Sequence, residues 1–108
     1  DVQQSIFASG VRTSIRPLMD QHSLVMRELG ECDFEFSGSG IQIWLGYSRD
    51  GPCCLISIPS VGVEQEHLYQ FFKQQFGEPS FRPKNPWSAS ESIQEYVGML
   101  GPVLNRYK

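Results

Sequence analysis

The chain has 108 residues, of which 40% are hydrophobic and 19% charged, a composition that excludes an intrinsically disordered chain. Its length predicts one compact domain, residues 1–108, that can bury a core without disulfides or metal. Twelve acidic residues against nine basic ones give a net charge of -3, which disfavours nucleic-acid binding through a broad basic face. No apolar run approaches the ~18 residues of a membrane span.

Two helical segments are expected before the first strand. Residues 1–12 are interpreted as a short helix or an N-terminal arm, because the apolar residues of this segment have helical separations. A longer helix is expected over 15–29, with Ser14 as its cap, Pro17 in its first turn and Gly30 at its end. Its apolar face would consist of Leu18, Met19, His22, Val25, Met26 and Leu29.

Three strands then follow as an antiparallel meander. Polar and apolar residues alternate over 32–36 and 41–47, and a third strand is expected over about 53–59. The Ser-Gly-Ser-Gly stretch at 37–40 and Asp50-Gly51 predict the two turns. This alternation places Trp44 on the outer face of the sheet, where it is either an interaction spot or covered by the N-terminal segment.

The last third of the chain predicts two helices separated by a loop. The first begins after Ser60-Val61-Gly62, with Glu64 and Glu66 in its first turn, and ends at Gly77 and Pro79. Residues 78–89 contain three prolines and are expected to form a loop. A final amphipathic helix, capped by Ser88 or Ser92, should kink or break at Gly101-Pro102.

The predicted order α-α-β-β-β-α-α gives an α+β fold, a three-stranded antiparallel meander with helices on one face. Over residues 15–76 this order resembles the double-stranded-RNA-binding domain. That family has a lysine cluster where this chain reads Val-Glu-Gln-Glu-His at 63–67, so the resemblance is one of topology. The order also resembles the small α+β chaperones of type III secretion, which are acidic and dimeric and bind a partner chain. Those have two further strands before the last helix, and residues 78–89 show no strand pattern.

The residue types needed for catalysis or metal binding are not clustered in the sequence. His22 and His67 have no second histidine or cysteine within a helical turn, and Cys53 and Cys54 point to opposite strand faces, so no metal site is expected. A Cys54 thiol near either histidine is conceivable, but small buried cysteines are common core residues. No glycine-rich phosphate loop precedes a helix, and no cofactor is expected.

The three cysteines, Cys32, Cys53 and Cys54, are an odd number and do not form a disulfide framework. We interpret them as reduced and expect a cytoplasmic protein. The chain begins at Asp1 and not at Met, so a removed leader stays open. Asp33 and Glu35 share a strand face near Gln42 and Trp44, which is either a polar site or the solvated face of a half-open sheet.

Two surfaces are candidates for binding. One is the outer sheet face around Trp44, Leu55 and Gln42. The other is the loop segment that carries Phe81, Arg82, Lys84 and Trp87, residue types that are common at interfaces, although its aromatic residues could simply anchor it.

These surfaces predict a non-catalytic protein-interaction module, chaperone- or inhibitor-like, that binds a partner protein or itself as a homodimer. The alternative is a small-ligand-binding protein or small enzyme, with a pocket between the sheet, helix 15–29 and the loop at 78–89. Asp33, Glu35, His22 and His67 are then the candidate polar groups. Neither a nucleic acid nor a membrane is expected as a partner.

Overall fold

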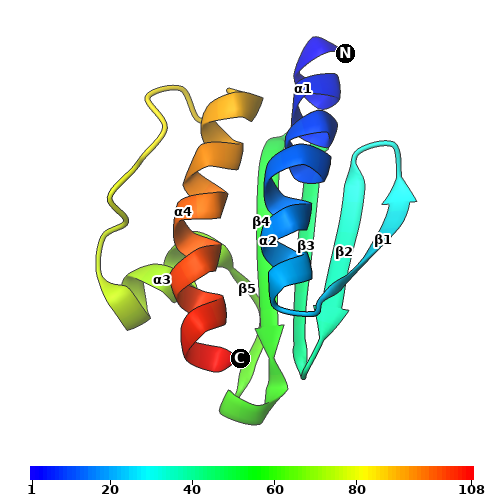
Figure 1. Cartoon of the computed structure of the whole chain (residues 1–108). Coiled ribbons are helices and arrows are strands. Elements are labelled where there is room, and N and C mark those ends of the chain that lie inside the picture. The colour runs from blue at the N-terminus through cyan, green and yellow to red at the C-terminus, as the bar shows by residue number, and fades with distance from the viewer.

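Five strands pair in the order in which they follow one another along the chain. The computed structural model describes residues 1–108 and shows an α+β fold with a five-stranded antiparallel sheet and three helices (Figure 1). The expected α+β class and antiparallel sheet are confirmed, but the predicted number of strands is wrong. The three predicted strands are the middle of the sheet, and a further strand lies at each edge. The five are β1 (Val25–Gly30), β2 (Asp33–Gly38), β3 (Ile41–Ser48), β4 (Gly51–Ile58) and β5 (Val63–His67).

Short turns join the middle strands, as the sequence predicts. Ser39 and Gly40 connect β2 to β3 with φ angles of 54° and 78°. Positive φ at both positions gives the turn the twist that a two-residue hairpin needs. Gly51, at the start of β4, also has a positive φ, 93°. The Asp50-Gly51 hairpin is therefore confirmed.

The helix predicted over 15–29 is wrong at both ends. The N-terminal helix is one continuous rod made of α1 (Val2–Gly10), a π-helical turn (Val11–Ile15) and α2 (Arg16–Gln21). Asp1 caps it instead of Ser14, since its Oδ1 accepts a hydrogen bond of 2.7 Å from the Gln3 amide. Pro17 is tolerated because it follows the π-helical turn, where the regular i to i+4 hydrogen bonding is already shifted.

The chain leaves the helix at Ser23, whose φ is 62°, and residues 25–29 belong to strand β1. Leu24 directs its side chain into the core and is 1% exposed. Val25 and Leu29 are exposed instead of lying on a buried helical face. The apolar residues in this segment therefore have helical spacing by coincidence. Pairing with β2 makes the segment a strand.

Residues 63–67 form β5 and not the first turn of a helix. Gly62 adopts a left-handed φ of 77° and turns the chain back along β4. Helix α3 therefore begins at Leu68 and runs to Phe76. Gly77, with a φ of 86°, ends it, as predicted.

Helix α4 (Ala89–Tyr107) begins where the sequence indicates and continues past the expected break. Ser88 caps it, since its hydroxyl accepts a hydrogen bond from the Glu91 amide. Pro102 lies inside the helix without breaking it. Because proline has no N–H, the carbonyl of Gly98 receives no hydrogen bond from Pro102. Both residues lie on the solvent side of the helix, where water can replace that bond.

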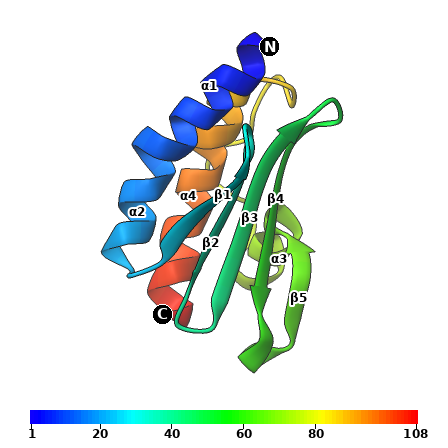
Figure 2. The same ribbon diagram turned by 90° about the vertical axis from the view of Figure 1, so that its right-hand side faces the viewer.

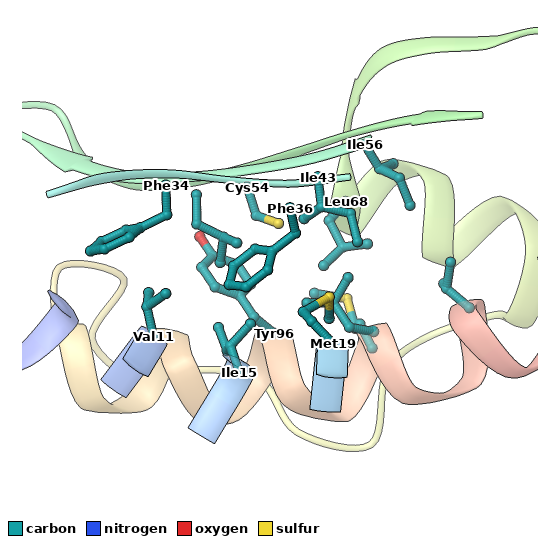
Figure 3. Close-up of a cluster of buried hydrophobic side chains, with 14 of the residues drawn as sticks. Val11, Ile15, Met19, Phe34, Phe36, Ile43, Cys54, Ile56, Leu68 and Tyr96 are labelled. Atoms are coloured by element: carbon teal, nitrogen blue, oxygen red, sulfur yellow. The ribbon is translucent and has the colours of Figure 1, made fainter. Parts of the chain in front are cut away.

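The core lies between the sheet and the helices, all of which cover the same sheet face (Figures 1 and 2). Figure 3 shows side chains of β2, β3 and β4 packed against those of the N-terminal helix and α4. Helices α1 and α4 lie side by side, and the rings of Phe7 and Tyr96 are 6.4 Å apart. None of the helices combines the length and apolar character needed to cross a membrane.

Candidate functional site

The face of the sheet that points away from the helices is uncovered (Figure 2). The N-terminal segment does not cover Trp44, because the N-terminal helix packs on the opposite face, where Phe7 and Val11 are fully buried. Trp44 itself is half-buried by its strand neighbours. The outward side chains are arranged in rows that cross the strands, because residues paired in register lie side by side.

The central row passes through Trp44 and crosses all five strands. Arg27 pairs with Glu35, Glu35 with Trp44, Trp44 with Leu55, and Leu55 with His67. The indole N–H of Trp44 donates a hydrogen bond of 2.9 Å to Glu35. The same carboxylate accepts an ion pair of 3.1 Å from Arg27. Polar contacts therefore hold the orientation of Trp44, with its ring left on the surface.

The next row consists of small residues and one carboxylate. Gly30 pairs with Asp33, Asp33 with Gly46, and Gly46 with Cys53. Because two of these residues are glycines and have no side chain, this row projects less far from the sheet than the Trp44–Leu55 row beside it. The result is an apolar groove of about 250 Å³. Its lining is Leu29, Asp33, Phe34, Trp44, Leu45, Gly46, Cys53 and Leu55.

A third row, from Val25 through Ser37 and Gln42 to Ser57, completes the face. Val25 is 70% exposed, and Leu29 beside the groove is 51% exposed. We call the three rows, together with Leu29, the outer face. The predicted residues Trp44, Leu55 and Gln42 all lie on it.

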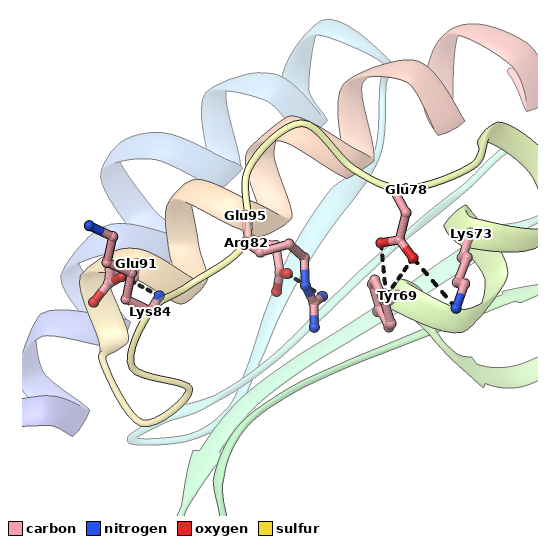
Figure 4. Close-up of polar contacts among 7 residues, drawn as sticks. All are labelled: Tyr69, Lys73, Glu78, Arg82, Lys84, Glu91 and Glu95. Carbon is pink, nitrogen blue, oxygen red and sulfur yellow. Dashed lines mark hydrogen bonds and ion pairs between the residues drawn. The ribbon is translucent and has the colours of Figure 1, made fainter.

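The other predicted binding residues lie elsewhere, in the loop between α3 and α4. We call residues 77–88 the strap. Arg82 of the strap stacks on Tyr69, 3.6 Å from the ring centre, and donates a hydrogen bond of 2.5 Å to Glu95 of α4 (Figure 4). The Lys84 amide donates to Glu91. These contacts attach the strap to the body of the protein.

The carbonyl of Trp87 also attaches the strap, since it accepts a hydrogen bond of 2.6 Å from the Tyr47 hydroxyl. The ring of Trp87 lies against Gly51 and keeps about half of its surface exposed. Phe81 is half-buried. The structure therefore does not join the strap residues with the outer face into one site, and it attaches the strap through the Arg82 side chain and the backbone of Lys84 and Trp87.

A second hollow of about 220 Å³ lies under the strap. Its lining comes from β4, the end of β5, the start of α3, the strap and α4, so the predicted pocket is bounded by α4 and not by residues 15–29. Ser92 and Tyr96, both more than nine-tenths buried, also line it, and no buried side-chain polar atom of the protein lacks a hydrogen-bond partner. Of the candidate polar groups, only His67 lines this hollow.

Burial controls the ionisation of the groups around this hollow. Desolvation raises the pKa of Glu95, and the Arg82 guanidinium opposes that shift. Desolvation also raises the pKa of the Cys53 thiol, and it raises that of the Cys54 thiol well above its usual value. Both cysteines are therefore held as thiols, whereas a nucleophilic cysteine needs a lowered pKa.

The remaining candidates are dispersed. His22 follows the last turn of α2 and is half-buried, and His67 ends β5 at the other side of the sheet. No three side chains of His, Cys, Asp or Glu gather in a way that could hold a metal ion. The sequence analysis missed Leu29 as part of this surface, because Leu29 was assigned to a helix. It also missed the groove, which appears only once the strand register is known.

Comparisons with known proteins gave no match. No protein-family model, no curated protein and no solved structure is similar to this chain.

Proposed function

We propose that this chain is a non-catalytic protein-interaction module that docks a partner protein on the outer face. The observation that carries the proposal is the contrast between the covered and the uncovered face of one sheet. The uncovered face bears an apolar groove beside Trp44 and two exposed aliphatic residues, Val25 and Leu29. Contiguous exposed apolar surface with a polar surround is typical of protein interfaces.

The fixed orientation of Trp44 supports the same function. A tryptophan held by Glu35 loses little side-chain freedom on binding, so it can contact a partner at a small entropic cost. Tryptophan is also among the residues that contribute most to interface energies. A chaperone-like or inhibitor-like role fits this surface, since both need a preformed docking face and no reactive group.

Self-association through the edge strand β1 is a less favoured version of this function. Its outer edge is free to pair, but it carries Arg27 and Glu28, and both already form ion pairs, with Glu35 and Arg12 respectively. The register also shifts between Glu28 and Gly30. Charges and bulges on an edge strand oppose pairing with another strand.

The test is affinity capture from a lysate of the source organism with tagged protein. Wild type is compared with Trp44→Ser and with the matched control Trp87→Ser, which alters the other exposed tryptophan. We expect a stoichiometric protein that is retained by wild type and the control and lost by Trp44→Ser, with all three proteins folded by circular dichroism. A protein lost only by Trp87→Ser would move the docking surface to the strap, and no captured protein would contradict the proposal.

A second candidate function, small-ligand binding, is favoured by the hollow under the strap. The hydroxyls of Ser92 and Tyr96, two polar residues of its lining, could hydrogen-bond a polar molecule there. A thermal-shift screen of small polar metabolites would test it, because a ligand that binds only the folded state raises the unfolding temperature. A stabilisation that disappears in Ser92→Ala/Tyr96→Phe, and persists in the control Tyr107→Phe, would support this function.

A further inference from the structure

The groove on the outer face is lined by apolar side chains and by one carboxylate. Trp44 and Leu55 are two of the apolar residues, and Asp33 is the only ionisable carboxylate in the lining. Asp33 lies between two glycines, with Gly30 on β1 and Gly46 on β3 as its paired neighbours. A Cβ atom placed on Gly46 would lie 2.7 Å from Asp33 Oδ1, so the carboxylate leans over the space that the glycine leaves empty.

The Asp33 carboxylate is unpaired, in contrast to its neighbour on the same strand face. Glu35 binds both Arg27 and the Trp44 indole, whereas Asp33 is exposed and makes no hydrogen bond or ion pair. An unpaired carboxylate in the lining of an apolar groove can accept hydrogen bonds from a cationic side chain whose aliphatic part lies along the groove.

The charge of the outer face also favours a cationic occupant. Three carboxylates point to this side of the sheet, those of Asp33, Glu35 and Glu64, the last of which lines a shallow hollow with Trp44 and Gln42. Apart from His67 at the end of the central row, the rows hold one basic side chain, Arg27, which is already paired with Glu35. A partner that presents positive charge is therefore attracted to this face, and an acidic one is repelled.

From these observations we infer that the groove receives an arginine side chain of the partner, and this inference rests on the proposed function. The aliphatic stem of the arginine lies along Trp44 and Leu55, and its planar guanidinium donates two hydrogen bonds to Asp33. Arginine fits better than lysine because its fork matches a carboxylate and its plane stacks on an indole. An apolar residue next to the arginine in the partner covers Leu29.

The experiment is a selection of phage-displayed random 12-residue peptides on the immobilised whole chain, followed by fluorescence anisotropy of the selected peptides after synthesis. We expect the selected sequences to be enriched in arginine beside an apolar residue. Asp33→Asn, which keeps the shape of the side chain, should weaken binding about tenfold or more, since a hydrogen-bonded charge is lost. The matched control is Asp50→Asn, which alters an exposed carboxylate in the β3–β4 turn and should leave binding unchanged.

Two further changes test the geometry from both sides of the contact. Gly46→Ala places a methyl group in the groove at a position with ordinary backbone angles, so it should weaken binding without unfolding the protein. Replacement of the peptide arginine by citrulline, which is neutral and of similar shape, should weaken binding to wild type and have little further effect on Asp33→Asn. Circular dichroism and thermal unfolding verify that each variant is folded.

The outcomes separate this inference from the proposed function. Peptides without enriched arginine, or enriched in lysine instead, that bind wild type and are lost by Trp44→Ser would overturn the arginine assignment and leave the docking face standing. Arginine peptides that bind Asp33→Asn as well as wild type would do the same. Selected peptides that bind Trp44→Ser as well as wild type would overturn both the arginine assignment and the docking face. The absence of any selected peptide would do the same.

Discussion

The two faces of the sheet are built from alternate residues of the same strands and meet opposite surroundings. On the covered face, Phe34, Phe36, Ile43 and Ile56 are at most 1% exposed and pack against the helices (Figure 3). On the outer face, Trp44 and Leu55 are half-buried, and Leu29 is half-exposed. The difference shows that burial is concentrated on one face of the sheet, so residues on the outer face contribute less to folding and keep part of their side chains accessible.

The largest expected effect is on the covered face. Phe36→Ala removes a fully buried ring and should lower the free energy of unfolding by about 3–5 kcal/mol, from lost burial and the cavity left behind. Trp44→Ser, its counterpart on the outer face, should cost about 1 kcal/mol. Urea unfolding of both variants measures the difference. Equal losses would show that the outer face stabilises the fold as much as the core does.

An intermediate effect is expected for Glu95, a carboxylate on the helical side of the sheet. Because burial raises its pKa above the ordinary value of 4.5, the folded protein binds this proton more tightly than the unfolded chain. Ionisation therefore lowers stability as the pH rises from about 4 toward the raised pKa. Glu95→Gln cannot ionise, so its free energy of unfolding should rise relative to that of wild type as the pH rises above about 4.5. A difference that is constant with pH would contradict the raised pKa.

The smallest effect is expected for Leu29, which is 51% exposed beside the groove. Leu29→Ser should change the free energy of unfolding by no more than about 0.5 kcal/mol. The matched substitution Leu24→Ser, at a residue that is 1% exposed, should cost several times more. Thermal and urea unfolding of the pair would sharpen the contrast, and a similar loss in both would mean that Leu29 is part of the folded core.

Alternation along the middle strands predicted the centre of the sheet, because one face of each is buried and the other is not. The edges were missed for two physical reasons. The apolar residues of 25–29 follow a helical period and do not alternate as in a half-buried strand, and the break at Ser23 uses a left-handed serine where a glycine would have signalled it. Strand β5 is polar because it lies at an edge, so Glu64 and Glu66 resembled the first turn of a helix.

The candidate site was predictable only in part. Period-two alternation placed Trp44, Gln42 and Leu55 on one face, which the register confirms. The groove needs information from four strands, since Gly30, Asp33, Gly46 and Cys53 become neighbours only through pairing. A sequence pattern within one strand carries no signal for such a row.

The contact between α1 and α4 joins the two ends of the sequence, with Phe7 against Tyr96 and Gly10 close to Ile93. Contacts between residues so far apart in the chain slow folding, because a long loop must close before they form. During synthesis the helix over residues 2–21 is made before α4 and has no partner for this side until residues 89–107 have left the ribosome. The apolar side of that helix is therefore exposed until α4 has been made, and a nascent chain stalled before α4 is prone to aggregate.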